Sequence, residues 1–335
     1  MTEERTKPTF DGKRFSNPAG PTLAKPHHLL RWFLTRKSAK WPRHLPNPPA
    51  DPVAQRVEGT RLRITLINHA TVLIQGGGLN ILTDPVFSQR VSPVSFAGPR
   101  RHRLPGIPLQ ELPPIDAILI SHTHYDHLDL HSIRQLHDRD KPLILAPLNT
   151  SHHISKVCDN NAVELNWWDR EPLTTGNAST SDFTATFVPS LHWTSRSLGD
   201  QNTSLWGGYV VSLPGGHIYF AGDTGYGTGQ HFLQAVAEFH SFRCALIPIG
   251  AYEPRWFMKP QHMNPAEAVQ AFENLQAKHA IGIHHGTFKL TDEAHDQPVL
   301  DLQVALEASR VAPEAFRALG NGQSWDIPED ESLSS

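Results

Sequence analysis

The chain has 335 residues, 39% of them hydrophobic, and its 30 Lys plus Arg against 33 Asp plus Glu leave a formal net charge of −3. This length can bury a large core. The near balance of charge excludes the basic surface that a general nucleic-acid binder needs, so we expect no nucleic-acid partner. Cys158 and Cys244 are too few for a disulfide framework, which predicts two buried thiols in a reducing compartment.

The first 45 residues are predicted to form an arm, because a Pro-rich link at residues 45–52 follows them. No apolar run approaches the length of about 18 residues that a membrane span needs, and the first ten residues are polar. We therefore expect a cytoplasmic protein. Residues 29–41 mix apolar and aromatic side chains with basic ones. This mixture is typical of a helix at a membrane interface, here the inner face, but equally of a short helix packed on the protein's own core.

The first half of the main domain reads as strands with one helix. Alternating apolar residues predict strands at 62–67, 70–75 and 80–84, joined by turns. A short, fully apolar strand at 117–120, a helix at 130–139 and a strand at 142–147 follow.

The second half repeats this scheme. The pattern predicts a strand at 183–188, a hairpin at 209–221, a helix at 230–239, a strand at 245–249, a capped helix at 264–278, a strand at 280–283 and a helix at 299–310. Two groups of strands, each flanked by helices, predict an α/β fold with four layers, helix, sheet, sheet, helix, in a single domain over residues 46–328. Residues 329–335 form an acidic tail.

A histidine-rich motif directly follows the strand at 117–120. His122, His124, Asp126 and His127 stand as H-x-H-x-D-H within six residues. Imidazole nitrogens and carboxylate oxygens are the ligands that zinc and similar divalent ions prefer. A lone histidine is more often an ordinary hydrogen-bonded residue, but four such side chains at one strand end indicate a metal site.

The motif resembles that of the metallo-β-lactamase-fold hydrolases, which carry further ligands at later strand ends. Candidates stand at each expected place: His192, Asp223 in a Gly-Asp-Thr-Gly turn, and His284. The resemblance implies an αββα sandwich with two divalent ions, Zn²⁺ by preference and Mn²⁺ or Fe²⁺ as alternatives. It assigns His122, His124 and His192 to one ion and Asp126, His127 and His284 to the other, bridged by Asp223. The choice of His284 over His285 follows only the family register.

Within this superfamily the chain is similar to the N-acylphosphatidylethanolamine-hydrolysing phospholipase D family and its bacterial relatives, over residues 29–325. The similarity is carried by residues 68–73, 82–87, 121–129, 221–226 and 248–259. It implies a phospholipase D-type phosphodiesterase that hydrolyses N-acylphosphatidylethanolamine, or a related lipid, to phosphatidic acid and N-acylethanolamine through a hydroxide shared by two metals. The chain departs from the mammalian enzyme at Thr123, where that enzyme has Asn, and at His285, where it has Trp.

Other residues are expected to assist this chemistry. His69 and Asp84 are candidates to support the ligands by hydrogen bonding, since metal-bound imidazoles need an acceptor for their second N–H; for Asp84, turn formation is the alternative. Gln261 and His262 resemble the family's substrate-facing pair, which would bind phosphate or protonate the leaving oxygen, although His262 could simply pack at a helix start. The catalytic candidates are thus Asp126, Asp223 and His262. The basic run at residues 100–103 could attract anionic head groups or be solvated surface.

Two other functions fit the same residues. One is a soluble two-metal hydrolase of a small ester, lactone or phosphodiester, similar to the sugar-phosphate lactonases of this superfamily. The other is a non-hydrolytic protein with a structural metal. We expect a lipid or membrane surface as the partner and a homodimer as the assembly.

Overall fold

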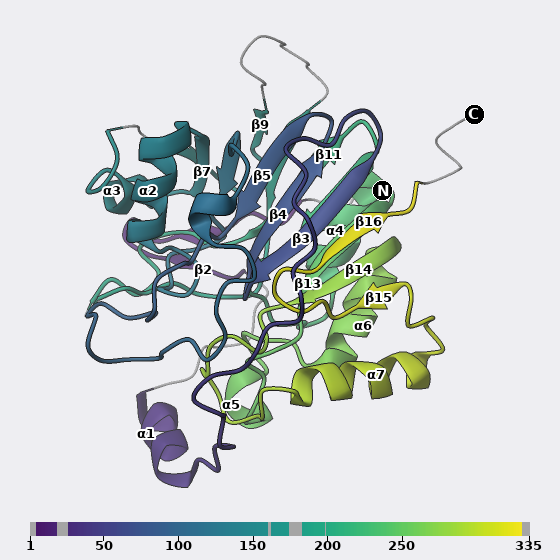
Figure 1. Cartoon of the computed structure of the whole chain (residues 1–335). Coiled ribbons are helices and arrows are strands. Elements are labelled where there is room, and N and C mark those ends of the chain that lie inside the picture. Colours follow the sequence, from purple (N-terminus) through teal and green to yellow (C-terminus); the bar gives the residue numbers. More distant parts are fainter. Residues whose placement is uncertain (1–4, 19–25, 160–161, 174–182, 198, 330–335) are drawn as a thin grey trace.

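The computed structural model describes residues 5–18, 26–159, 162–173, 183–197 and 199–329. Two seven-stranded sheets stack on each other, with helices on the outer face of each (Figure 1). The first sheet has the order β16-β3-β4-β5-β6-β7-β8 and the second β15-β14-β13-β12-β11-β10-β9. A separate two-stranded hairpin, β1 (Thr9–Phe10) with β2 (Phe15–Ser16), lies near the N-terminus.

The first sheet consists of β3 (Leu62–Asn68), β4 (Thr71–Gly76), β5 (Leu79–Thr83), β6 (Ala117–Leu119), β7 (Leu143–Pro147), β8 (Val163–Leu165) and β16 (Ser324–Ile327). Its helical segments are η1 (Leu109–Glu111), α2 (Leu130–Asp140) and α3 (Ser151–Ile154). The strands β5, β6, β7 and β8 run parallel, so their carboxyl ends meet at one edge.

The second sheet consists of β9 (Arg170–Pro172), β10 (Thr184–Val188), β11 (Gly208–Leu213), β12 (Gly216–Phe220), β13 (Phe242–Pro248), β14 (Ala277–Ile283) and β15 (Phe316–Arg317). Its helices are α4 (Gln230–Phe239), α5 (Arg255–Met258), α6 (Pro265–Asn274) and α7 (Gln297–Ser309). The expected cap of α6 is present, because Asn264 and Glu267 form a reciprocal capping box with Pro265 at the first helical position.

Three hydrophobic clusters separate four layers. Leu66, Trp206 and Phe220 belong to the cluster between the two sheets. A second cluster joins the first sheet to α2, and a third joins the second sheet to α4, α6 and α7. The predicted helix, sheet, sheet, helix sandwich is therefore confirmed. Both cysteines are free and buried, as expected.

The largest difference from the expected boundaries in the second half lies between α6 and β14. The helix expected to reach Lys278 ends at Asn274, and β14 begins at Ala277. The reason is tertiary: Ala277 pairs with Phe242 of β13, and Gln276 takes a left-handed conformation with φ 48° to make the turn. Pairing with β13 thus outweighs the helical tendency of the segment.

The described residues of the segment that was predicted to form an arm contact the rest of the domain. Phe15 is buried, and its N–H donates to the Asn202 carbonyl. Asn17 accepts from the Trp206 indole at 3.1 Å and donates to the carbonyl of His192 at 3.0 Å. The domain boundary at residue 45 stays a prediction. Residues 1–4 and, of the acidic tail, residues 330–335 lie outside the described part.

Helix α1 (Pro26–Thr35) covers part of residues 29–41. The Trp32 ring stacks on Phe257 with centroids 5.2 Å apart, and its indole donates to Asp292 at 2.9 Å. The side chains of residues 26, 29, 30 and 33 are not described. In the described part of the chain, none of the helices has both the length and the apolar character needed to cross a bilayer.

Candidate metal centre

The candidate ligands gather where strands of both sheets end. The motif at residues 122–127 follows β6, Asp223 follows β12 and His284 follows β14. His69, Asp84 and His284, each directly after a strand, have positive φ values of 46°, 32° and 62°. Such left-handed conformations cost non-glycine residues about 1–3 kcal/mol each and collect at functional sites. The fold therefore holds this edge in a conformation that local preference opposes.

Three imidazoles form the first group: His122, His124 and His192. Nδ1 of His124 lies 2.9 Å from Nε2 of His122 and 3.2 Å from Nε2 of His192. A tetrahedral zinc ion with bonds of 2.0–2.1 Å separates its ligand atoms by about 3.3 Å. The three nitrogens therefore fit a single ion.

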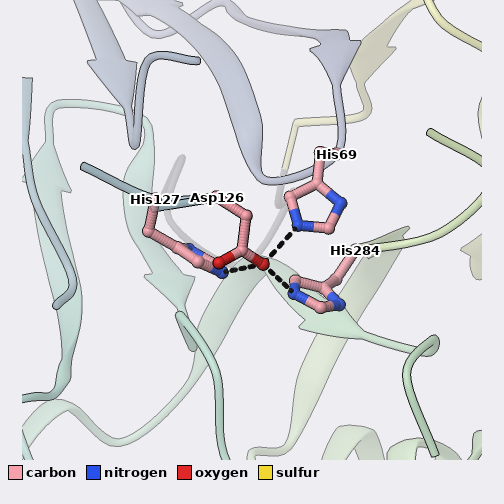
Figure 2. Close-up of side chains that lie close together, drawn as sticks. All are labelled: His69, Asp126, His127 and His284. Atoms are coloured by element: carbon pink, nitrogen blue, oxygen red, sulfur yellow. Dashed lines mark hydrogen bonds and ion pairs between the residues drawn. The ribbon is translucent and has the colours of Figure 1, made fainter. Parts of the chain in front are cut away.

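The second group is His69, Asp126, His127 and His284 (Figure 2). Oδ2 of Asp126 lies 3.5 Å from Nε2 of His127, 3.4 Å from Nε2 of His284 and 3.1 Å from Nε2 of His69. Figure 2 shows the three rings directed at one carboxylate oxygen. The structure therefore adds His69, expected only as a support, to the group that faces Asp126.

Asp223 lies between the two groups. Its Oδ2 is 3.2 Å from Nε2 of both His127 and His284, and 3.7 Å and 4.0 Å from Nε2 of His192 and His122. Among the described residues, Oδ1 of Asp223 and Nε2 of His127 and His284 are buried without a hydrogen-bond partner. Buried polar atoms without partners are costly, so this donor set fits divalent cations.

Hydrogen bonds on the far side of the rings orient three of the imidazoles. Nδ1 of His127 donates to Asp84 at 2.6 Å, Nδ1 of His192 donates to the Gln261 carbonyl at 3.1 Å, and Nδ1 of His122 donates to Ser121 Oγ at 2.9 Å. A neutral ring held in this way would present its Nε2 lone pair to the centre.

Ser121 was not singled out from the sequence. Its hydroxyl and backbone N–H donate to Asp84 at 2.5 Å and 2.7 Å. Asp84 thus holds the chain at both ends of the motif, at the backbone of Ser121 just before it and at the ring of His127, its last residue. The proximity of Ser121 to the motif was visible in the sequence, but its bond to Asp84 required the pairing of β5 with β6.

Burial and mutual charge set the protonation of the metal-free groups. Burial and the neighbouring imidazoles hold the pKa of His122 well below its usual value, and burial does the same for the pKa of His192, so both are neutral, the form that binds metals. Burial favours a protonated Asp223, but His127 and His284 outweigh it and hold the Asp223 pKa well below its usual range. For His284, burial is outweighed by Asp223 and Asp126, which raise its pKa to about 9.

Two remaining candidates, His262 and Gln261, lie beside the centre. His262 is buried, with Nδ1 3.9 Å from Oδ2 of Asp223 and no hydrogen-bond partner for that nitrogen among the described residues. Gln261 reaches the centre through its backbone carbonyl, while its amide donates to the Met258 sulfur at 3.7 Å. The structure places His284 rather than its neighbour in the sequence, His285, against both carboxylates, with Nε2 of His284 3.4 Å from Asp126 and 3.2 Å from Asp223.

The basic run at residues 100–103 is not a continuous exposed cluster, because one of its members lies inside the protein. Arg101 is buried, and its guanidinium donates to the carbonyls of Val86, Ser88 and Arg103. Its role is to tie loops together, because a buried guanidinium with three carbonyl partners has no access to a lipid head group.

Comparison with known proteins agrees with this geometry. The family model described as a beta-lactamase superfamily domain matches residues 79–285. The N-acyl-phosphatidylethanolamine-hydrolyzing phospholipase D 1 of Caenorhabditis elegans is 36% identical over 273 residues, which are 79% of this chain and 76% of that protein. A UPF0173 metal-dependent hydrolase of Archaeoglobus fulgidus is 28% identical over 275 residues, 79% of this chain and 99% of that protein.

A solved structure gives the same fold. A possible metal-dependent hydrolase from Veillonella parvula matches with a TM-score of 0.61 at 15% identity, covering 80% of this chain and 100% of that one. The chain therefore belongs to the beta-lactamase superfamily, as a metal-dependent hydrolase of the metallo-β-lactamase fold that resembles N-acylphosphatidylethanolamine-hydrolysing phospholipase D.

Proposed function

We propose that the protein is a two-metal phosphodiesterase of the phospholipase D type that cleaves N-acylphosphatidylethanolamine, or a related lipid, into phosphatidic acid and N-acylethanolamine. The observation that carries the proposal is Asp223, whose carboxylate oxygen lies between two groups of imidazoles, His122 with His192 and His127 with His284. The lipid part of the proposal is supported by the 36% identity to the worm phospholipase D.

The residues of the centre have different proposed roles in metal and substrate binding. His122, His124 and His192 would hold one divalent ion, Asp126, His127 and His284 the other, and Asp223 both. Two bound ions would supply polarisation of the phosphoryl oxygens and a water of lowered pKa. We assign His262 to a hydrogen bond with the substrate phosphate, because its ring lies beside Asp223 and its Nδ1 has no hydrogen-bond partner within the described part of the chain. Gln261 would position His192 through its carbonyl and the substrate through its amide.

We further propose that the protein is cytoplasmic and acts as a homodimer at the inner face of the membrane. Leu34 on α1 is 78% exposed and Trp256 on α5 is 43% exposed, with the Arg31 guanidinium 4.5 Å from the Trp256 ring centroid. Exposed apolar side chains beside basic ones favour an interface with anionic lipid.

Leu34→Ser should raise the KM for lipid vesicles about tenfold, since burying a leucine is worth about 1.5–3 kcal/mol. Leu300→Ser, at an exposed leucine of α7, should leave this KM unchanged.

The decisive experiment is release of N-acylethanolamine from N-acylphosphatidylethanolamine in mixed micelles by the zinc-loaded protein. Asp126→Asn and a chelator should each abolish it, and Asp138→Asn, at a surface aspartate of α2 paired with Arg134, should not. A protein that contains two metals and releases nothing would falsify the lipid assignment. Hydrolysis of soluble esters, lactones or phosphodiesters, without any response to lipid, would then identify the alternative substrate class.

A further inference from the structure

Arg196 and Tyr125 join two loops that carry candidate ligands. Arg196 lies four residues after His192, and Tyr125 lies between His124 and Asp126. Nη1 of Arg196 donates to the Thr123 carbonyl at 2.7 Å and to the Leu128 carbonyl at 2.8 Å. These two carbonyls lie on either side of the segment that contains His124, Asp126 and His127. One guanidinium nitrogen thus fixes both ends of the ligand segment.

The contact is reciprocal. The Tyr125 hydroxyl donates to the Arg196 carbonyl at 2.9 Å, and the guanidinium lies over the Tyr125 ring, 4.0 Å from its centroid. Each loop therefore supplies one side chain that bonds to the backbone of the other. A guanidinium stacked on an aromatic ring is attracted to the ring's negative face, more strongly where water is partly excluded.

The Arg196 loop is itself held in shape. Asp200 accepts hydrogen bonds from the hydroxyls of Ser195 and Ser197, both at 2.9 Å, and from the backbone N–H of Arg196. The carboxylate of Asp200 therefore holds the backbone from which the Arg196 guanidinium projects.

We infer that these reciprocal contacts of Arg196 and Tyr125, called the Arg196–Tyr125 interlock below, position the ligands of the first group, His122, His124 and His192. The interlock fixes the segment of His124 relative to the loop of His192, two ligands whose nitrogens lie 3.2 Å apart although 68 residues separate them. This inference rests on the ligand assignment proposed above. Groups that orient ligands typically account for about 10- to 100-fold in metal affinity.

Arg196→Met keeps an unbranched side chain but removes both hydrogen bonds and the charge. One of the two bound zinc ions should leave about 10- to 100-fold faster when a chromogenic chelator is added. The rise in melting temperature on zinc binding should also shrink. Lys156→Met is the control, because Lys156 lines the same cavity of about 660 Å³ beside Arg196 and has no part in the interlock; its zinc release should match the wild type.

Two milder variants keep the test decisive if Arg196→Met folds poorly. Arg196→Lys should recover part of the zinc retention, and Tyr125→Phe, which loses one hydrogen bond and keeps the ring, should speed zinc release about threefold. Zinc release at the wild-type rate, or an equal fall in the melting temperatures of the metal-free and zinc-loaded forms, overturns the inference. Zinc release is measured without substrate, so the outcome is separate from whether the protein hydrolyses lipid.

Discussion

The two halves of the molecule contribute to the candidate metal centre in different ways. The first half places His122, His124, Asp126 and His127 within six residues after β6. The second half contributes single residues from separate strand ends: His192 after β10, Asp223 after β12 and His284 after β14. Candidate ligands within one short segment are positioned relative to one another by the local backbone. Candidate ligands at separate strand ends are positioned by the packing of the sheets. The difference predicts which substitutions affect one ion and which affect both.

The largest effect is expected at Asp223, the dispersed residue that faces both groups. Asp223→Asn should lower hydrolysis about 1000-fold or more, since loss of metal assistance removes several kcal/mol of transition-state stabilisation. Both ions should be lost. Asp126→Asn should retain one ion per chain, because the imidazoles that Asp126 contacts in the described structure, His69, His127 and His284, all belong to the second group. The number of bound metal ions per chain, measured in the dialysed variants, tests this difference. Two bound ions in Asp223→Asn would contradict the bridging role of Asp223.

A smaller effect than at Asp223 is expected at Asp84, which supports the motif by hydrogen bonds. Asp84→Asn preserves shape but weakens the acceptor for Nδ1 of His127 and for Ser121. Metal affinity should fall about 10- to 100-fold, measured by competition with a zinc chelator. Asp138→Asn again serves as the matched substitution, and equal affinities in the two variants would leave Asp84 with a role in the turn alone.

Metal removal should affect stability in a pH-dependent way. In the metal-free protein Asp223 and Asp126 outweigh burial and raise the His284 pKa to about 9. The protonated ring therefore stabilises the metal-free fold fully below about pH 6.5 and loses this contribution as pH rises through 9. Zinc must displace this proton, so the melting-temperature difference between zinc-loaded and chelated protein should grow from pH 6.5 to 9. A constant difference would argue against metal binding at His284.

The smallest effect is expected far from the centre, where β16 joins the first sheet. Arg63 donates twice to Asp326, at 2.6 Å each, and both side chains are partly exposed. Asp326→Asn should cost about 0.2–1 kcal/mol of unfolding free energy, visible in urea titration, and should leave zinc content unchanged. Loss of metal in this variant would mean that the two halves are more tightly coupled than their contacts indicate.

Much of the fold was predictable because its strands have clear patterns. The alternating and fully apolar segments corresponded to β3, β4, β5, β6 and β7, and α4 appeared at its expected residues. Short elements were missed, among them α3, α5 and β15, since two to four residues carry little pattern. The start of β14 was also missed, because its first residue is fixed by Phe242 on a neighbouring strand.

The sequence by itself determined the motif at residues 122–127, the layered α/β fold and the seven candidate ligands, since a short ligand run and a resemblance can both be read along one chain. Only the tertiary structure decided that His284 rather than His285 faces the carboxylates, that His69 contacts Asp126 at 3.1 Å, and that Arg196 spans two loops. Contacts of this kind join residues tens to hundreds of positions apart. Strand pairing and sheet packing create them, and no local pattern records them.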